Sequence, residues 1–162
     1  MSLEGRINVD CLFHDKATND LSSSLRVASA AYSLPLTDGT GANQAQVTWT
    51  NTATNDGGTA DELIVQSLSD DRGTVSLTAV KAIYIRNKSA LYSLRVAVDS
   101  WTSLDSTLLP FNLVLPAGGV CIYTNPTATG WTTTANSALS LLASAEGQSV
   151  EYDILLVGEG SV

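Results

Sequence analysis

The chain has 162 residues, of which 44% are hydrophobic and only 15% are charged. This length fits a single domain that buries about two-thirds of its surface, and the composition excludes a disordered, charge-rich protein. The formal charge is −8, all eight basic residues lie at or before Arg95, and the rest of the chain carries six acids and no base. An acidic surface repels phosphate groups, so we expect no direct binding to nucleic acid or to an anionic membrane.

The N-terminus lacks the cationic start and long apolar run of a signal peptide, and no stretch of about 18 apolar residues occurs. We therefore expect a protein that is made and assembled in a cytoplasm. Cys11 and Cys121 are the only cysteines, too few for a disulfide scaffold or a thiolate zinc site. We predict that each is a small hydrophobic residue of the core.

Hydrophobic residues at every second position predict a strand with one buried face, and this pattern begins near the N-terminus. The residues that share the first such face are Ile7, Val9, Cys11 and Phe13. The polar segment 15–24 predicts a loop, so residues 1–24 are expected to form a strand with an arm or loop. Alternation resumes at Leu25 and is expected to stop at Pro35, whose missing N–H ends a central ladder or marks an edge.

A glycine-rich stretch follows, running from Asp38 to Asn43. It is not a dinucleotide fingerprint, because Gln44 stands where the third glycine is needed and a strand follows instead of a helix. A phosphate-binding P-loop is excluded because no Gly-Lys-Ser or Gly-Lys-Thr occurs. We predict a turn that sets the register of a strand over 44–51, with Ala45, Val47 and Trp49 on its buried face.

The rest of the chain contains further short apolar runs separated by turn residues. Strands are expected at 62–68, 74–90 (one bent strand or two), 91–100 and 149–160, and a hairpin-like pair is expected around Pro116-Ala117-Gly118-Gly119. Residues 136–145 are ambiguous: Leu139, Leu142 and Ala143 have helical spacing, so a short helix competes with a strand. Eight to ten short strands predict an all-β, antiparallel β-sandwich or jelly roll in one domain covering 1–162.

The sequence offers little that indicates catalysis. His14 is the only histidine, and no nucleophile motif such as Gly-x-Ser-x-Gly accompanies it. Glu151 and Asp153 share one face of the last strand, where a solvated acidic surface is a better interpretation than a glycosidase pair, because few aromatics are present to line a sugar cleft. We therefore assign no catalytic residue, cofactor or metal, although a surface calcium site remains open.

Three tryptophans are candidates for packing or binding. Trp49 alternates with Val47 and is expected in the core. Trp101 and Trp131 lie in Ser/Thr-rich loops, where we predict exposed rings that act as interface anchors. These two residues also provide the main support for an alternative function, a carbohydrate-binding module.

Several strings taken together resemble a known family. They are "GRINVDCLFHD", "LTDGTGANQAQVTWTNT", "VKAIYIRN", "LVLPAGGVCIYTNPTATGW" and "VEYDILLVGEG". In this order they are similar to small β-rich virion structural proteins of tailed bacteriophages, and the likeness covers about residues 34–158.

The resemblance implies a non-enzymatic structural protein located in the virion, on the capsid surface, after assembly in the host cytoplasm. The role it implies first is that of a capsid decoration, or cement, protein that forms a homotrimer and binds the major capsid protein. The N-terminal segment or the segment 15–24 would then extend as an arm onto the shell. The alternative is a tail-associated protein of the tube, tip or receptor-binding fibre.

Overall fold

The computed structural model describes residues 3–19, 22–99, 113–144 and 146–162. These residues form strands and turns, and none of them is helical. The all-β prediction is confirmed, with more strands than expected. They are β1 (Gly5–Asn19), β2 (Ser22–Asp38), β3 (Gln44–Ala45), β4 (Val47–Asn55), β5 (Asp61–Ile64), β6 (Leu68–Asp70), β7 (Gly73–Asn87), β8 (Leu94–Asp99), β9 (Leu113–Leu115), β10 (Val120–Thr124), β11 (Trp131–Thr132), β12 (Ala138–Ala143) and β13 (Val150–Ser161).

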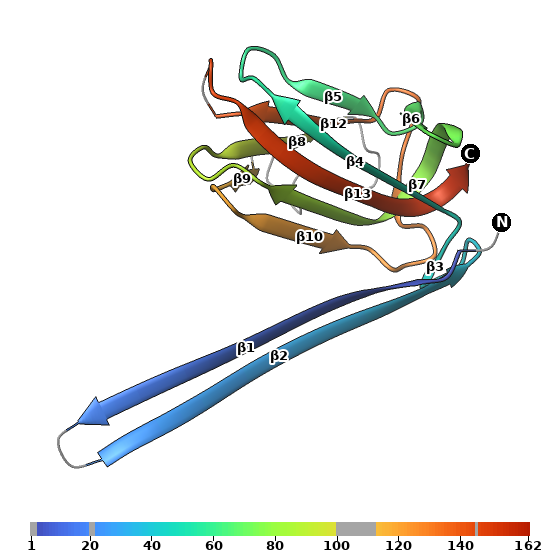
Figure 1. Cartoon of the computed structure of the whole chain (residues 1–162). Helices are drawn as coiled ribbons and strands as arrows, with labels where there is room; N and C mark the ends of the chain where they lie inside the picture. Colours follow the sequence, from blue (N-terminus) through green and yellow to red (C-terminus); the bar gives the residue numbers. More distant parts are fainter. Residues whose placement is uncertain (1–2, 20–21, 100–112, 145) are drawn as a thin grey trace.

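Two sheets face each other and form a sandwich (Figure 1). Sheet I has the order β10-β7-β13-β4, with β6 and β11 also paired to β7, and sheet II has the order β5-β12-β8-β9. The hydrophobic core between them includes Trp49, Ile83 and Ile154 from sheet I and Val96 and Leu139 from sheet II. The class of antiparallel β-sandwich is thereby confirmed.

The segment 74–90, expected as one bent strand or two, is one long strand, β7, paired along much of its length with β13. The pairing shifts register between Val157 and Gly158 and between Glu159 and Gly160. At both glycines the neighbouring backbone lies very close: a Cβ on Gly158 would sit 2.0 Å from a carbonyl oxygen of β7, and one on Gly160 would sit 1.8 Å away. Only glycine fits where these β-bulges press the two backbones together.

The glycine-rich stretch 38–43 is a turn, as predicted. Gly39 has φ 134° and Asn43 has φ 57°, both in the left-handed region, and the Gly41 N–H donates to the side-chain oxygen of Gln44 over 2.7 Å. The expected single strand is divided at Gln46, whose N–H donates to the carbonyl of Gly158 over 2.8 Å. The predicted shared face is therefore wrong for one of its three residues, because β3 and β4 pair with different strands.

This division assigns the three apolar residues of the stretch to two clusters. Val47 and Trp49 enter the core between the sheets, as predicted. Ala45 instead packs with Leu34 and Leu36 against the opposite face of sheet I. Side chains alternate in direction along a strand. A break of one residue at Gln46 therefore turns the side chains that follow it toward the other side of sheet I.

The described part of the segment 136–145 contains strand β12 (Ala138–Ala143) and no helix, so the competing helix is wrong. β12 lies between β5 and β8 and pairs with both. Its buried face is set by Leu139 and Leu141, at a spacing of two, whereas Leu142 is only partly buried. Two flanking strands offer backbone donors and acceptors on both sides, which a helix would leave without partners.

The Pro116–Gly119 turn does not connect a hairpin, contrary to the prediction. The Gly119 N–H donates to the Pro116 carbonyl over 2.9 Å, so the tight turn itself is present. However, β9 pairs with β8 in sheet II and β10 pairs with β7 in sheet I. The turn therefore carries the chain across the edge of the sandwich, because each flanking run finds its partner in a different sheet.

Strands β1 and β2 form a long antiparallel hairpin, which we call the arm. It leaves the sandwich near β3 and extends well past it (blue in Figure 1). Fifteen residue pairs run from Gly5↔Leu36 to Asn19↔Ser22, so the loop predicted at 15–24 is wrong and both strands continue through it. Pro35 does not end β2. It lies where β2 has an open edge, the other alternative predicted, because β2 has a second neighbouring strand only at Thr37 and Asp38.

Candidate interaction surface

Trp131, one of the two tryptophans predicted as interface anchors, is buried. Trp131 lies in β11, which pairs with β7 at Val80, and its side chain is only 8% exposed within the core. The expectation of an exposed ring is wrong because pairing with the long central strand directs this loop residue into the sandwich. Trp101 lies outside the described residues. The carbohydrate-binding alternative therefore loses the support that Trp131 provided.

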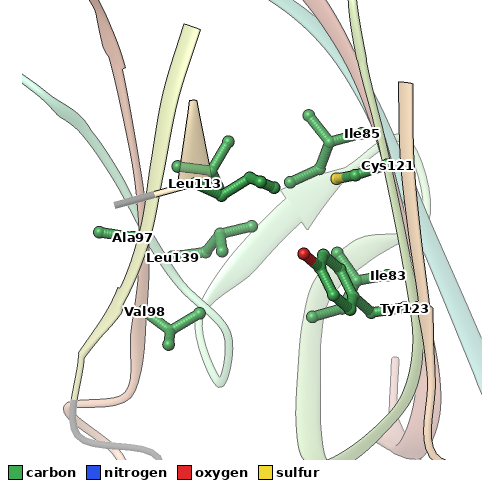
Figure 2. A pocket seen from close by; sticks show the side chains of 9 residues that line it. Ile83, Ile85, Ala97, Val98, Leu113, Cys121, Tyr123 and Leu139 are labelled. Atoms are coloured by element: carbon green, nitrogen blue, oxygen red, sulfur yellow. The ribbon is translucent and has the colours of Figure 1, made fainter. Parts of the chain in front are cut away.

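The two cysteines occupy different surroundings. Cys11 is exposed on the arm, so its predicted place in the core is wrong. Cys121 lies on β10 and points between the sheets toward Leu113 and Leu139, next to Tyr123 (Figure 2). Burial raises the pKa of the Cys121 thiol to about 11. The cavity that these side chains line has a volume of about 20 Å³, space for about one water molecule and too small for a metabolite.

The carboxylates on the last strand take part in a surface ion cluster. Lys88 forms an ion pair with Glu151, and its ammonium nitrogen lies 3.6 Å from Asp153 Oδ1. The Thr52 hydroxyl also donates to Asp153 over 2.7 Å. The hydrogen bond to Glu151 is the main reason that the pKa of Lys88 is raised. The carboxylates are thus engaged by neighbours at the surface, and the described residues contain no group of three His, Cys, Asp or Glu side chains placed to hold a metal.

Asn87 is a buried polar residue whose role the sequence analysis missed. Its side-chain amide lies 2.8 Å from the carbonyl of Tyr92, 3.1 Å from that of Leu115 and 2.9 Å from that of Pro116, and its oxygen accepts the Ser89 N–H over 2.9 Å. The side chain has no exposed surface. It therefore fixes the chain where it crosses from sheet II to sheet I. The signal available in the sequence was a polar asparagine at the end of β7, two positions after the apolar run ends at Ile85.

Lys81 is also fully buried, in the middle of β7. Its ammonium nitrogen lies 2.8 Å from Glu159 Oε1 and donates to the carbonyls of Thr127 and Ala128 over 2.5 and 2.6 Å. A buried charge requires such partners, because isolated it is strongly unfavourable. The arrangement ties the loop after β10 to the end of β13. These contacts form an internal cross-link between the two segments.

The root of the arm packs on the outer face of sheet I. Leu34 and Leu36 of β2 are almost fully buried there against Ala82 of β7 and Val157 of β13, with Ile7 of β1 partly covered. These contacts cover the first rows of the arm. The predicted alternation of Ile7 and Val9 is present, but the apolar side of the arm packs on the outer face of sheet I and not in the core between the sheets.

Beyond its root, the arm diverges from the sheet and leaves an open groove, which we call the arm groove. It is lined by Val9 and Tyr32 from the arm and by Val120, Ile122 and Thr124 from β10, and it has a volume of about 540 Å³. The hydroxyls of Tyr32 and Thr124 lie 3.0 Å apart and bridge its two walls. None of the described residues that line it is charged. Such a lining suits an apolar segment of a protein better than an ionic ligand.

A second, more enclosed hollow of about 230 Å³ adjoins the arm groove nearer the root. It is lined mainly by apolar side chains of sheet I, among them Ala82, Leu155 and Val157, and by Arg6, Ile7 and Asn8 of the arm. Tyr32 and Val120 at the arm groove are also among the large hydrophobic residues that remain exposed in the described structure. Together, the two hollows and these residues make this side the best candidate for an interaction surface.

Comparison of the chain with models of protein families and with curated proteins found no match to either. The described residues also contain no helix that is long and apolar enough to cross a membrane.

Proposed function

We propose that the chain is a structural protein of a tailed-phage particle, and specifically a capsid decoration protein that binds the assembled lattice of the major capsid protein. The observation that carries the proposal is the arm. Ten of its fifteen residue pairs, from Asp10↔Ala31 to Asn19↔Ser22, lie beyond the rows that line the arm groove. A two-stranded hairpin is only marginally stable in water by itself, so this length of arm calls for a surface outside its own chain.

A compact sandwich with a protruding arm is well suited to bridging subunits of a lattice. The sandwich would bind one capsid subunit and the arm a neighbouring one. Once the first contact has formed, the second is effectively intramolecular, so the two contacts strengthen each other. Binding that exists only in the assembled lattice stabilises that lattice by mass action. The likeness to small phage virion proteins covers about residues 34–158, from the end of β2 to β13.

The electrostatics of the chain agree with a place on the outside of a DNA-filled shell. The formal charge is −8 and the sequence pI is about 4.3. Like charges keep such a protein away from DNA and favour its solubility before assembly. In this proposal the chain acts as a homotrimer and without catalysis, since its contribution is contact area between subunits.

The experiment that tests the proposal compares phage particles that contain the protein with particles that lack it. We expect the protein-free particles to release their genome at a lower temperature, and added purified protein to bind assembled capsids but not free capsid protein. A matched control is a chain whose arm is shortened by replacing residues 12–29 with Asn-Gly, a pair suited to a two-residue hairpin turn. It should retain the sandwich but restore less capsid stability.

Imaging of intact particles separates this role from the alternative. Density for the chain on the head supports decoration. Density on the tail, together with unchanged temperature of genome release, would replace the proposal with a tail-associated role.

A further inference from the structure

We infer that the arm of one copy occupies the arm groove of a second copy, so that copies of the chain associate through β1 or β2 of one and β10 of the other. This inference deepens the homotrimer contained in the proposed function by naming the contact surface. It is tested in solution without capsids, so its failure would leave the binding of a monomer to a capsid untouched.

The first step concerns the length of the arm. The ten pairs beyond the arm groove extend about 34 Å at about 3.4 Å per residue. The remainder of the chain, about 120 residues, has an expected radius of gyration of about 14 Å and therefore a diameter of about 35 Å. The protruding part of the arm is thus long enough to cross one neighbouring sandwich. The arm runs obliquely past its own sandwich, diverges from it and extends beyond it (Figure 1).

The second step concerns the face of the arm that the body leaves open. Residues opposite each other in an antiparallel pair point to the same side. Ile7 and Leu34 point at sheet I, the next pair on this side, Val9 and Tyr32, lines the arm groove, and the following pair is Cys11 and Ala30. The side chains of this last pair are small and exposed. The side that packs on sheet I therefore continues outward as a surface that another strand can approach closely.

The third step concerns the open edge of β10. Among the described strands, β10 pairs with β7 alone, so its other edge offers unpaired backbone groups beside the arm groove. Monomeric proteins protect such edges with charges, proline or a bulge. The strand, Val120–Thr124, contains no charged residue and no proline, and its pairing with β7 proceeds without a register shift. An added strand from another chain would satisfy this edge.

Charge favours a second copy as the occupant. Residues 7–33 carry three acids and two bases, a sum of −1, whereas the whole chain carries −8. Another copy of this acidic chain can therefore approach the arm without strong repulsion, and no charged side chain among the described residues lines the arm groove. Each copy has an exposed arm and an open arm groove. When the arm of one copy binds in the arm groove of another, both surfaces are buried in the same contact.

Sedimentation of the full chain over a range of concentrations tests the inference with two matched variants. Val120 lines the arm groove and is 49% exposed, and Val114 lies in edge strand β9 of the other sheet and is 50% exposed. Both substitutions to glutamate place a charge at an already exposed position, so neither should unfold the chain. We expect Val120→Glu to weaken self-association at least tenfold and Val114→Glu to leave it unchanged.

A cross-linking experiment identifies the contact directly. One chain carries Cys11 with Cys121→Ser, and a second, differently tagged chain carries Val120→Cys with Cys11→Ser and Cys121→Ser. After coexpression and mild oxidation, a disulfide between the two tags can form only between copies, and we expect it in high yield. The control replaces Val120→Cys with Val114→Cys and should give almost none.

A full chain that remains monomeric at every concentration would overturn the inference. So would association that survives both Val120→Glu and the shortened arm described above, because the contact would then lie elsewhere. Equal cross-linking yields at the two valine positions would have the same consequence.

Discussion

Replacing Asn87 tests whether the passage of the chain from sheet II to sheet I depends on one buried amide. Asn87→Ala removes the donor that faces the carbonyls of Tyr92, Leu115 and Pro116, and the acceptor for the Ser89 N–H. The amide has two hydrogens, so two of the three carbonyls are fully satisfied at any moment. The site is closed to solvent, since the side chain has no exposed surface.

The expected magnitude follows from the groups left without partners. A buried donor or acceptor without a partner costs about 1–3 kcal/mol. Two carbonyls and one N–H are affected, and partial relaxation of the turn reduces the sum, so we expect Asn87→Ala to lower the free energy of unfolding by about 3–5 kcal/mol. Asn87→Asp, which has the same shape, should lower it further, because a carboxylate would face three carbonyl oxygens. Either loss is a large part of a typical total of about 5–15 kcal/mol.

The measurement is urea unfolding at one fixed protein concentration, with the slope of the transition compared among variants. The control is Asn51→Ala, an exposed asparagine in β4, which should change the free energy by less than about 0.5 kcal/mol. A loss below about 1 kcal/mol for Asn87→Ala, or a smaller loss for Asn87→Asp than for Asn87→Ala, would refute this account of the crossing.

Three further predictions concern the thiols, a bulge and a surface carboxylate. At pH 8 a thiol reagent should modify Cys11 in the native chain and leave Cys121 protected, because its pKa is raised to about 11, and unfolding should expose both; equal native rates would contradict this. Gly158→Ala should cost about 3 kcal/mol in urea unfolding because its Cβ meets backbone, whereas Gly58→Ala, with open space around it, should be nearly neutral. A hydrogen bond from the neighbouring guanidinium lowers the pKa of Asp70 below its ordinary 3.8, so the carboxylate stabilises the fold above that pH, and the stability is lost as pH falls through the lowered value. Asp70→Asn should therefore reduce the loss of unfolding free energy below pH 4, and an unchanged pH profile would contradict the prediction.

The alternation of apolar residues predicted much of the sandwich. Val47 and Trp49 lie in the core as expected, and the last strand forms where Val150, Tyr152 and Ile154 alternate. These predictions succeed because each side of a strand meets one environment, so a period of two is visible in the sequence itself. The turn at 38–43 was predictable for a similar reason, since it requires residues that accept positive φ.

The interaction surface was predicted least well. Trp131, chosen as an anchor from a Ser/Thr-rich loop, is buried, while the exposed Tyr32 and Val120 were not considered. Tyr32 and Val120 lie 88 positions apart in the sequence, and nothing local to either indicates that the arm and β10 border one groove. Whether an aromatic ring is exposed depends on which strands its segment pairs with. The residues next to the ring in the sequence do not indicate those partners.

The fold class, the negative net charge and most of the strand positions follow from the sequence alone, because they depend on composition and on spacing between near neighbours. Which strands pair with each other follows from the tertiary structure. It made 138–143 a central strand instead of a helix, separated the two runs around Pro116–Gly119 into different sheets, and extended β1 and β2 into an arm. Strand pairing joins residues far apart in the chain through backbone groups that every residue carries, so side-chain patterns give it no distinct signature.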